Sequence, residues 1–242
     1  MYNKACLALL LDGPMQSWGF ASRFTRRTTA LHPTKSGVCG LLAAALGYDK
    51  HSVDEPVQVA RLATLTCTTV TLPKKRGSGE LPMLRLSDYH TIGGGYEKGT
   101  ERMKKPRAAS GAVLETVLSE RHYLLDARFG VLLEGDADFL AAIATALENP
   151  RWGLWFGRKC CIPASPLCVG VFISPVDALK SLLNRSGLNE ALTLDHFDHV
   201  LEDPAESETD AEWLTDTPVS YGAEIGQRHA PRRIIQKRRR MA

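Results

Sequence analysis

The sequence predicts an α+β domain of the ferredoxin-like type, and three observations predict it. Segments with strand and helix periodicity follow one another over residues 1–175 in the order strand–helix–strand–strand–helix–strand. A long excursion without core-forming residues separates the second and third strands. An apolar content of 44% supports a sizeable core. Residues 176–242 do not continue this pattern, and we expect them to form an irregular C-terminal extension.

Local signals predict the first strand and the first helix. Residues 6–11 form an almost wholly apolar run, which is typical of a strand buried on both faces, and Gly13-Pro14 ends it. Thr34 and Ser36 are N-cap candidates, because apolar residues follow them at helical spacing. Gly47 is the expected end of this helix.

A protruding hairpin, or thumb, is predicted in the middle of the chain. Residues 59–72 alternate between apolar residues and threonines, and residues 113–133 form a second apolar stretch with a bend expected near residues 121–123. We interpret each stretch as a long strand. The basic, glycine-rich segment between them, about residues 73–111, is then the thumb insertion, and a solvated mobile loop is the competing interpretation.

Helix signals return after the second long strand. Residues 136–149 are amphipathic with acidic residues at the start, and Pro150 stops the helix. Residues 152–166 read as irregular, residues 167–173 as a short strand, and residues 175–185 as a short helix.

Charge is segregated along the chain although the net charge is only +3. Residues 1–110 carry 16 Lys and Arg against 8 Asp and Glu, whereas residues 186–217 carry 10 acidic residues and no basic one. The last 25 residues return 7 basic residues against 1 acidic residue. We expect the acidic segment, residues 187–218, to be mobile or peripheral, and the basic tail, residues 228–240, to be either solvated or in contact with nucleic-acid phosphates.

The loop before the first helix predicts an anion-binding site. It carries Arg23, Arg26, Arg27 and Lys35, and it leads into a helix N-terminus whose free N–H groups and positive dipole end favour an anion such as phosphate. The spacing is not that of a nucleotide-binding P-loop. An ordinary turn with closely packed glycines is the alternative interpretation of each part.

Enzyme, metal and membrane signatures are weak. The six cysteines include no Cys-x-x-Cys pair, so buried free thiols in a reducing compartment are expected rather than disulfides or structural zinc. His196 and His199 are three residues apart and could hold a metal, but a solvated acidic segment explains them as well. We predict no cofactor. No apolar run approaches the roughly 20 residues of a membrane span, so a cytoplasmic location is expected.

Several blocks of the sequence resemble the CasD family, whose members hold the 5′ handle of the guide RNA in type I CRISPR surveillance complexes (Cascade). The blocks begin at Gly13-Pro14 and run in the family's order to about residue 171, beyond which the resemblance is weak. The type I-E branch fits best. The blocks are residues 13–19, Arg26-Arg27-Thr28, residues 33–37, Gly40-Leu41-Leu42, residues 88–91, residues 157–163 and residues 165–167.

The resemblance implies a non-catalytic subunit that caps the 5′ handle of the crRNA. It implies contacts with the backbone and large subunits of the complex, and with target DNA only through the complex. The residues expected to bind RNA are Gly13, Gln16, Trp18, Arg23, Arg26, Arg27, Lys35, Ser36, Gly37, Tyr89, His90, Gly157, Arg158 and Lys159. The ferredoxin-like sheet is also the scaffold of RNA-recognition domains, but an aromatic-rich strand motif is not visible.

Two other functions stay open at this point. The first is a metal-independent endoribonuclease that processes precursor crRNA, with Tyr89, His90 and Lys98 supplying a base, an acid and a cation. Relatives of the type I-C branch carry out this reaction, whereas in the type I-E branch a separate subunit cuts the RNA. The second is a general module for single-stranded nucleic acid, whose basic hairpin would be its whole binding surface.

Overall fold

Seven strands form the main sheet of the protein, shown here as a computed structural model that describes residues 3–19, 25–76, 79–93, 116–203, 210–222 and 226–239. Every neighbouring pair of strands runs antiparallel. The prediction of a mixed fold of helices and strands is therefore confirmed. From one edge to the other the order is β10 (Cys168–Phe172), β1 (Lys4–Asp12), β9 (Arg128–Asp136), β4 (Thr66–Thr71), β11 (His199–Glu202), β13 (Arg228–Lys237) and β12 (Glu212–Ser220).

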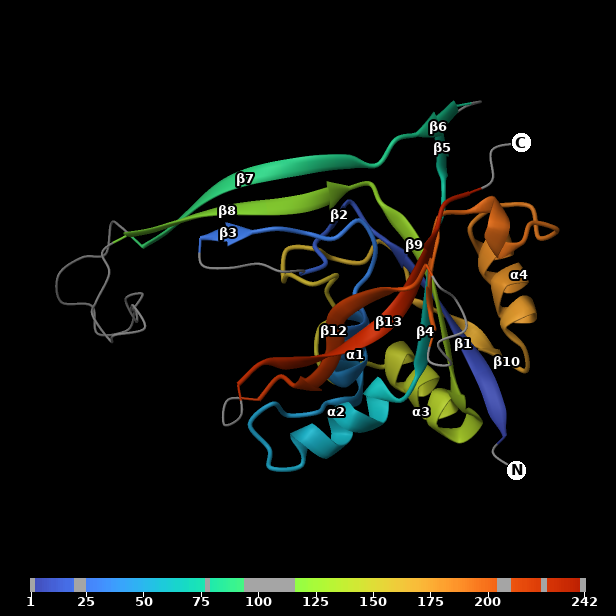
Figure 1. Ribbon diagram of the computed structural model, residues 1–242, viewed down its shortest axis with the longest axis horizontal. Helices are drawn as coiled ribbons and strands as arrows, with labels where there is room; N and C mark the ends of the chain where they lie inside the picture. Colours follow the sequence, from blue (N-terminus) through green and yellow to red (C-terminus); the bar gives the residue numbers. More distant parts are fainter. Residues whose placement is uncertain are drawn as a thin grey trace.

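Helices cover both faces of this sheet, and β1 lies between them (Figure 1). Alternate residues of a strand point to opposite faces, so the apolar run of β1 serves two cores. Leu7, Leu9 and Leu11 pack with α1 (Lys35–Leu46) and α3 (Ala137–Glu148). The alternating residues Cys6, Ala8 and Leu10 pack with α4 (Pro175–Arg185) on the other face. The predicted burial of this strand on both faces is confirmed.

The helix ends agree with the capping signals in the sequence. Thr34 Oγ1 accepts a hydrogen bond from Gly37 N at 3.2 Å, and Gly47 ends α1 in the left-handed region with φ 77°. Asp136 Oδ1 accepts from Phe139 N at the start of α3, over 2.9 Å. The helices predicted at residues 136–149 and 175–185 are confirmed.

Two of the predicted long strands are wrong in detail. Residues 59–72 begin as the end of α2 (Glu55–Ala63), and only β4 is a strand. Val59 and Leu62 lie on the buried face of α2. The apolar pattern at the start of this stretch is therefore that of a short amphipathic helix, although it also fits the alternation of a strand. The second stretch is two strands, β8 (Thr116–Leu125) and β9, divided by Asp126 in a left-handed conformation with φ 51° rather than bent at residues 121–123.

The hairpin protrudes from the body of the molecule, as Figure 1 shows. Its strands are β7 (Leu84–Gly93) and β8, paired antiparallel from Leu84 opposite Leu125 to Gly93 opposite Thr116. Two short strands add to β8: β2 (Met15–Gln16) pairs with it at its base, and β3 (Arg26–Arg27) pairs with it midway. The segment predicted as the thumb insertion, about residues 73–111, contains β7 and also the small ribbon of β5 (Lys74–Arg76) and β6 (Gly79–Leu81). The end of the thumb, residues 94–115, lies outside the described residues.

The C-terminal extension completes the main sheet instead of lying beside it. Strand β11 pairs with β4 on one side and with β13 on the other, and β12 forms the outer strand of this end of the sheet. The short helix η1 (Leu194–His196) precedes β11. The prediction of a mobile or peripheral acidic segment is thus wrong for β11, which is an inner strand, whereas β12 does lie at the periphery as the edge strand. The basic tail is an inner strand of this half of the sheet.

Candidate nucleic-acid interface

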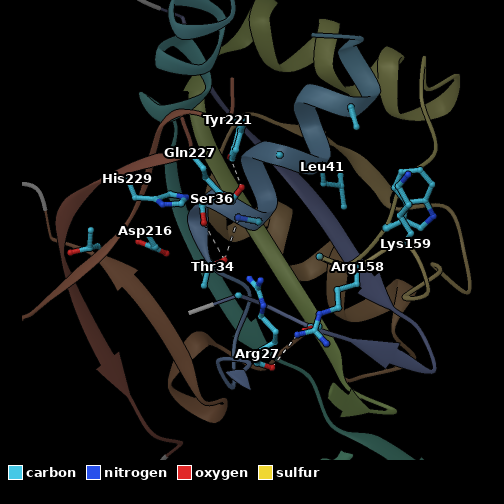
Figure 2. Close-up of a pocket in the computed structure, with 18 of the residues that line it drawn as sticks. Arg27, Thr34, Ser36, Leu41, Arg158, Lys159, Asp216, Tyr221, Gln227 and His229 are labelled. Carbon is cyan, nitrogen blue, oxygen red and sulfur yellow. Dashed lines mark hydrogen bonds between the residues drawn. The ribbon is translucent and has the colours of Figure 1, made fainter. Parts of the chain in front are cut away.

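A groove of about 1030 Å³ opens beside the N-terminal end of α1. Its lining comes from five parts of the chain: Ser17 and Gly19, Arg27, the start of α1 with its cap Thr34, the loop at residues 153–159, and strands β12 and β13 with the residues flanking them (Figure 2). We call this space the α1 groove. It brings together Arg27, Ser36, Gly37, Gly157, Arg158 and Lys159, six of the residues predicted to bind RNA.

One wall of the α1 groove is cationic. Arg158 Nη2 donates a hydrogen bond to the backbone oxygen of Arg27 over 3.0 Å, and its guanidinium lies 4.7 Å from the ring centre of Tyr123. These contacts hold the side chain in place, while Arg158 Nη1 is buried and has no hydrogen-bond partner among the described residues. Lys159 Nζ lies 5.8 Å from the ring centre of Trp155. An arginine held in this way can present fixed donors to a phosphate.

Two glycines allow the backbone segments around the groove to approach closely. At Gly37, an added Cβ would lie 2.8 Å from the Trp18 ring, so a side chain there would push α1 away from its loop. At Gly157, φ is +88° and an added Cβ would lie 1.7 Å from the Ser17 oxygen. Both glycines therefore act through packing of the groove wall, and Gly157 also sets the turn that presents Arg158.

The N-terminus of α1 already holds a carboxylate from its own chain. Lys35 N donates to Asp216 Oδ2 over 2.7 Å, so the positive end of the helix dipole meets β12. The Lys35 ammonium lies 2.9 Å from Glu202 Oε1, and its side chain is only 6% exposed. The structure therefore gives Lys35 and the helix start an internal partner in place of the external anion that the sequence predicts.

A buried cluster of four charges results, formed by Lys35, Glu202, Asp216 and Arg232. Arg232 donates to both carboxylates, over 2.6 and 3.0 Å to Asp216 and 2.7 Å to Glu202. Burial by itself lowers the pKa of Arg232, but the hydrogen bonds and charge of Asp216 outweigh it and raise that pKa. The two cations and two anions balance, so the acidic segment and the basic tail neutralise each other inside the fold.

Three further predicted site residues are structural. Gln16 and Trp18 are both fully buried. Gln16 Nε2 donates to the backbone oxygens of Leu11 and Ala127, and Gln16 Oε1 accepts from Trp18 Nε1 over 3.0 Å. An added Cβ at Gly13 would lie 2.8 Å from the Ile162 oxygen. These residues fix the loop after β1 against the body of the protein, and they do not line the α1 groove.

The hairpin residues lie apart from the α1 groove. Arg26 is on the exposed strand β3, with its Nε 3.8 Å from Glu120 Oε2. Tyr89 is 69% exposed on β7, and the next residue, His90, has its Nδ1 3.6 Å from Asp88 Oδ2. Arg23 lies outside the described residues. The predicted site therefore divides into the α1 groove and a second surface on the hairpin.

Sequence reasoning missed the wall that β12 and β13 supply. This wall includes Trp213 on β12 and His229 on β13, and also Tyr221 and Gln227, which directly follow β12 and precede β13. The Tyr221 hydroxyl donates to the Ser36 oxygen, and the Tyr221 backbone N–H donates to the buried Glu55 carboxylate over 2.6 Å. A tryptophan inside an otherwise acidic, aromatic-poor segment is the one local signal that points to this wall.

In the described part of the chain, His, Cys, Asp and Glu side chains do not form a group of three or more that could hold a metal ion. His196 and His199 turn to separate partners, Thr193 and the Phe197 oxygen respectively. Among the described helices, none is long and apolar enough to cross a membrane.

Comparison with known proteins identifies the family of this chain. A family model described as CRISPR-associated protein (Cas5) matches residues 6–241. The CRISPR system Cascade subunit CasD of Escherichia coli (strain K12) is 33% identical over 190 residues, which cover 75% of this chain and 77% of the relative.

Two solved structures are also similar. A chain of a CRISPR RNA-guided surveillance complex has a TM-score of 0.68 and 29% identity, with 97% of this chain and 90% of that chain covered. The crystal structure of a Cas protein has a TM-score of 0.60 and 28% identity, covering 96% and 93% of the two chains. The family model spans nearly the whole sequence, and the fold agrees over the same length, so the chain belongs to the Cas5 family of CRISPR-associated proteins.

Proposed function

We propose that this protein is a Cascade subunit that binds the 5′ handle of the crRNA and does not cut it. The observation that carries the proposal is the α1 groove, in which Arg27 meets Arg158 and Lys159 on one wall although Arg27 is more than 130 residues away from them in sequence. A single-stranded RNA handle offers phosphates to such a wall and unpaired bases to the rest of the groove.

The strand order supports the ferredoxin-like assignment. Counted from one edge of the main sheet, the first four strands are β10, β1, β9 and β4, and neighbours are antiparallel. In sequence, α1 and α2 connect β1 to β4, and α3 connects β9 to β10. A split βαβ pair of this kind places the two crossover connections on one face of the sheet. We assign these elements to the ferredoxin-like unit at residues 1–175, and β7–β8 to its thumb. Residues 176–242 form the extension.

Partners follow from the same proposal. The CasD relative is named as a Cascade subunit and the similar solved chain belongs to an RNA-guided surveillance complex. We infer that this protein likewise assembles with crRNA and with the backbone and large subunits of its complex, and that it meets target DNA only through them. The exposed hairpin, with Tyr89, Leu84 and Leu118 on its surface, is the element that reaches farthest toward such neighbours.

The geometry of the hairpin argues against catalysis by Tyr89 and His90 together. They are consecutive residues of β7, so their side chains leave opposite faces of the hairpin. Tyr89 is opposite Glu120 on one face, and His90 is opposite Ser119 on the other. A base and an acid must reach the same phosphodiester, and this placement separates them. Lys98, the third candidate, lies outside the described residues.

Two measurements test the proposal. The pure protein should bind RNA that carries the handle of its own repeat more tightly than a scrambled RNA of equal length. Replacing Arg27 and Arg158 with alanine should reduce the slope of log affinity against log salt by about 0.7 for each lost phosphate contact. Lys180→Ala on α4, an exposed cation on the opposite face of the sheet, should leave the slope unchanged. An unchanged slope in the double variant would remove the α1 groove from the RNA path.

Catalysis is tested separately with repeat-containing RNA in EDTA. We expect the wild type to leave this RNA intact. Specific cleavage at the handle boundary that is lost in His90→Ala would overturn the non-catalytic assignment. Removal of a general acid or base typically slows a reaction about a hundred- to ten-thousand-fold, so the two outcomes are easily separated.

A further inference from the structure

The wall of the α1 groove that faces the cations carries side chains that the fold does not use. Trp213 on β12 is 65% exposed, and it lines the groove at the outer strand of the sheet. Leu214 and Asp216 lie on the buried face of the same strand, where Leu214 packs into a small core and Asp216 is hydrogen-bonded to Arg232. An indole offers a large flat apolar surface, and here that surface is left to solvent.

A second unused group lies on the neighbouring strand. His229 on β13 lines the same groove, and its Nε2 is buried without a hydrogen-bond partner among the described residues. A buried polar atom that stays unpaired is unfavourable, so such an atom at a groove wall is placed to pair with a ligand. Burial lowers the pKa of His229, against the opposing effect of Asp216, so the ring is neutral near pH 7 and presents a neutral hydrogen-bonding edge.

The two walls differ in the part of a nucleotide that each can accept. Arg27, Arg158 and Lys159 suit phosphates, and in Figure 2 the labelled His229 and Gln227 lie across the start of α1 from Arg158 and Lys159. In single-stranded RNA the bases extend away from the phosphates, so a strand that follows the cationic wall turns bases toward β12 and β13. The groove volume, about 1030 Å³, reaches the upper end of the range for small-ligand pockets and gives a nucleotide room.

We propose that Trp213 and His229 form a nucleobase subsite, in which one unpaired base of the bound RNA stacks on the Trp213 indole and the edge of a neighbouring base pairs with His229 Nε2. Trp213 is opposite Arg233, four residues from His229 on β13, so the two side chains serve successive bases. This inference rests on the proposed function, and it adds a base-binding element from the C-terminal extension. Stacking on aromatic side chains is the common way in which proteins hold unpaired bases, and the β12–β13 wall supplies such a platform beside the cations.

The test compares affinities for two RNAs of equal length, one with the handle of the repeat and one scrambled. Trp213→Ala should weaken binding of the handle RNA about five- to 150-fold, the effect of one lost base stack, with the salt slope unchanged. Trp213→Phe keeps an aromatic face and should bind within a few-fold of the wild type. Trp152→Ala is the matched control, because Trp152 is also exposed, at 43%, but does not line the α1 groove. It should bind like the wild type.

Abasic nucleotides then locate the stacked base. At one handle position, removal of the base should weaken binding by the wild type as much as Trp213→Ala does, and should have no further effect on that variant. His229→Phe should weaken binding of the intact handle about two- to tenfold, the effect of one hydrogen bond. Its fold should stay intact by thermal unfolding.

The outcomes separate this subsite from the proposed function. Wild-type binding without preference for the handle would overturn the proposed function, while loss of affinity for both RNAs in Trp213→Ala would still support the subsite. Equal affinity of Trp213→Ala and the wild type would overturn the subsite and leave the phosphate contacts standing. A wild type that binds neither RNA would overturn both.

Discussion

Single residues in this protein often do something other than their chemistry suggests from the sequence alone. Lys35 lies in a basic loop at a helix start, yet its ammonium forms an ion pair with Glu202 and its backbone N–H donates a hydrogen bond to Asp216. Arg158 follows a glycine and keeps one terminal nitrogen without a partner among the described residues. Whether a cationic side chain is free to bind an external anion therefore depends on whether the fold supplies a carboxylate to pair with it.

Removing a charge from the buried cluster should cost far more stability than removing an exposed charge. Asp216→Ala leaves the Lys35 N–H buried without a partner and leaves one carboxylate, Glu202, facing two buried cations, so we expect it to lower the free energy of unfolding by about 3–5 kcal/mol. Arg26→Ala removes an exposed cation whose ion pair with Glu120 is loose at 3.8 Å, and it should change stability by less than about 1 kcal/mol. Urea unfolding of both variants measures the difference. Equal effects would show that the cluster does not hold the C-terminal strands in place.

Two left-handed glycines provide a second matched test. Gly157→Ala meets both the backbone penalty of φ +88° and a Cβ only 1.7 Å from the Ser17 oxygen, so it should destabilise the protein by about 3 kcal/mol or more. Gly187→Ala has φ +67° and open space around its added Cβ, so about 1–2 kcal/mol is expected. Thermal unfolding compares them. If Gly187→Ala proves as harmful as Gly157→Ala, close packing against Ser17 is not what requires glycine at residue 157.

At the scale of elements, the hairpin stands out because it is paired along its whole described length but packed over only part of its surface. Tyr123 and Leu124 of β8 are buried, whereas Leu84 and Leu86 beside them on β7, and Leu118 farther out, stay exposed. Backbone pairing therefore maintains the hairpin, and its surface remains available to a partner.

Shortening the hairpin should separate folding from assembly. Replacement of residues 94–115 by an Asn-Gly turn joins Gly93 directly to Thr116, which are already opposite one another. We expect cooperative unfolding with nearly unchanged stability, together with impaired assembly with crRNA and the other subunits. Co-purification and denaturant titration are the measurements. Loss of cooperative unfolding would instead make the replaced segment part of the core.

At the scale of the whole molecule, the C-terminal extension closes the structure from the far end of the sheet. It pairs β11 with β4, and it supplies the carboxylate at the start of α1. The Glu55 carboxylate on α2 accepts from Ser220 Oγ over 2.8 Å, which adds a second buried link between the two parts of the chain. The extension therefore shares the core beneath α4 and the α1 groove with the N-terminal unit, and it adds a small core of its own.

Truncation after Ser186 tests this dependence. It exposes the edge of β4 and leaves the Lys35 ammonium without Glu202, so we expect loss of cooperative unfolding or a large fall in stability. Removal of residues 240–242 alone is the control and should change little. Calorimetry distinguishes the outcomes. A truncated protein with wild-type stability would show that residues 3–186 fold independently.

The sequence by itself determined the elements whose signals are local. Thr34 and Gly47 mark the ends of α1, Asp136 caps α3, and the uniform apolar run of β1 predicts its burial on both faces. The glycines and cations of the α1 groove were also predicted, because they stand in short recognisable blocks. A helix cap or a buried strand depends on neighbours a few residues away, so one segment contains all the information needed.

Only the tertiary structure decided which charges and aromatic residues are free. Lys35 and Asp216 are 181 residues apart, and their pairing follows from sheet order rather than from either local sequence. The acidic segment and the basic tail look solvated when each is considered alone, since neither could bury its charges without the other. Once β13 lies between β11 and β12, Arg232 meets Glu202 and Asp216, and Trp213 is left on the surface of the groove. Trp18, by contrast, is enclosed in the core where α1 and Phe156 pack against it.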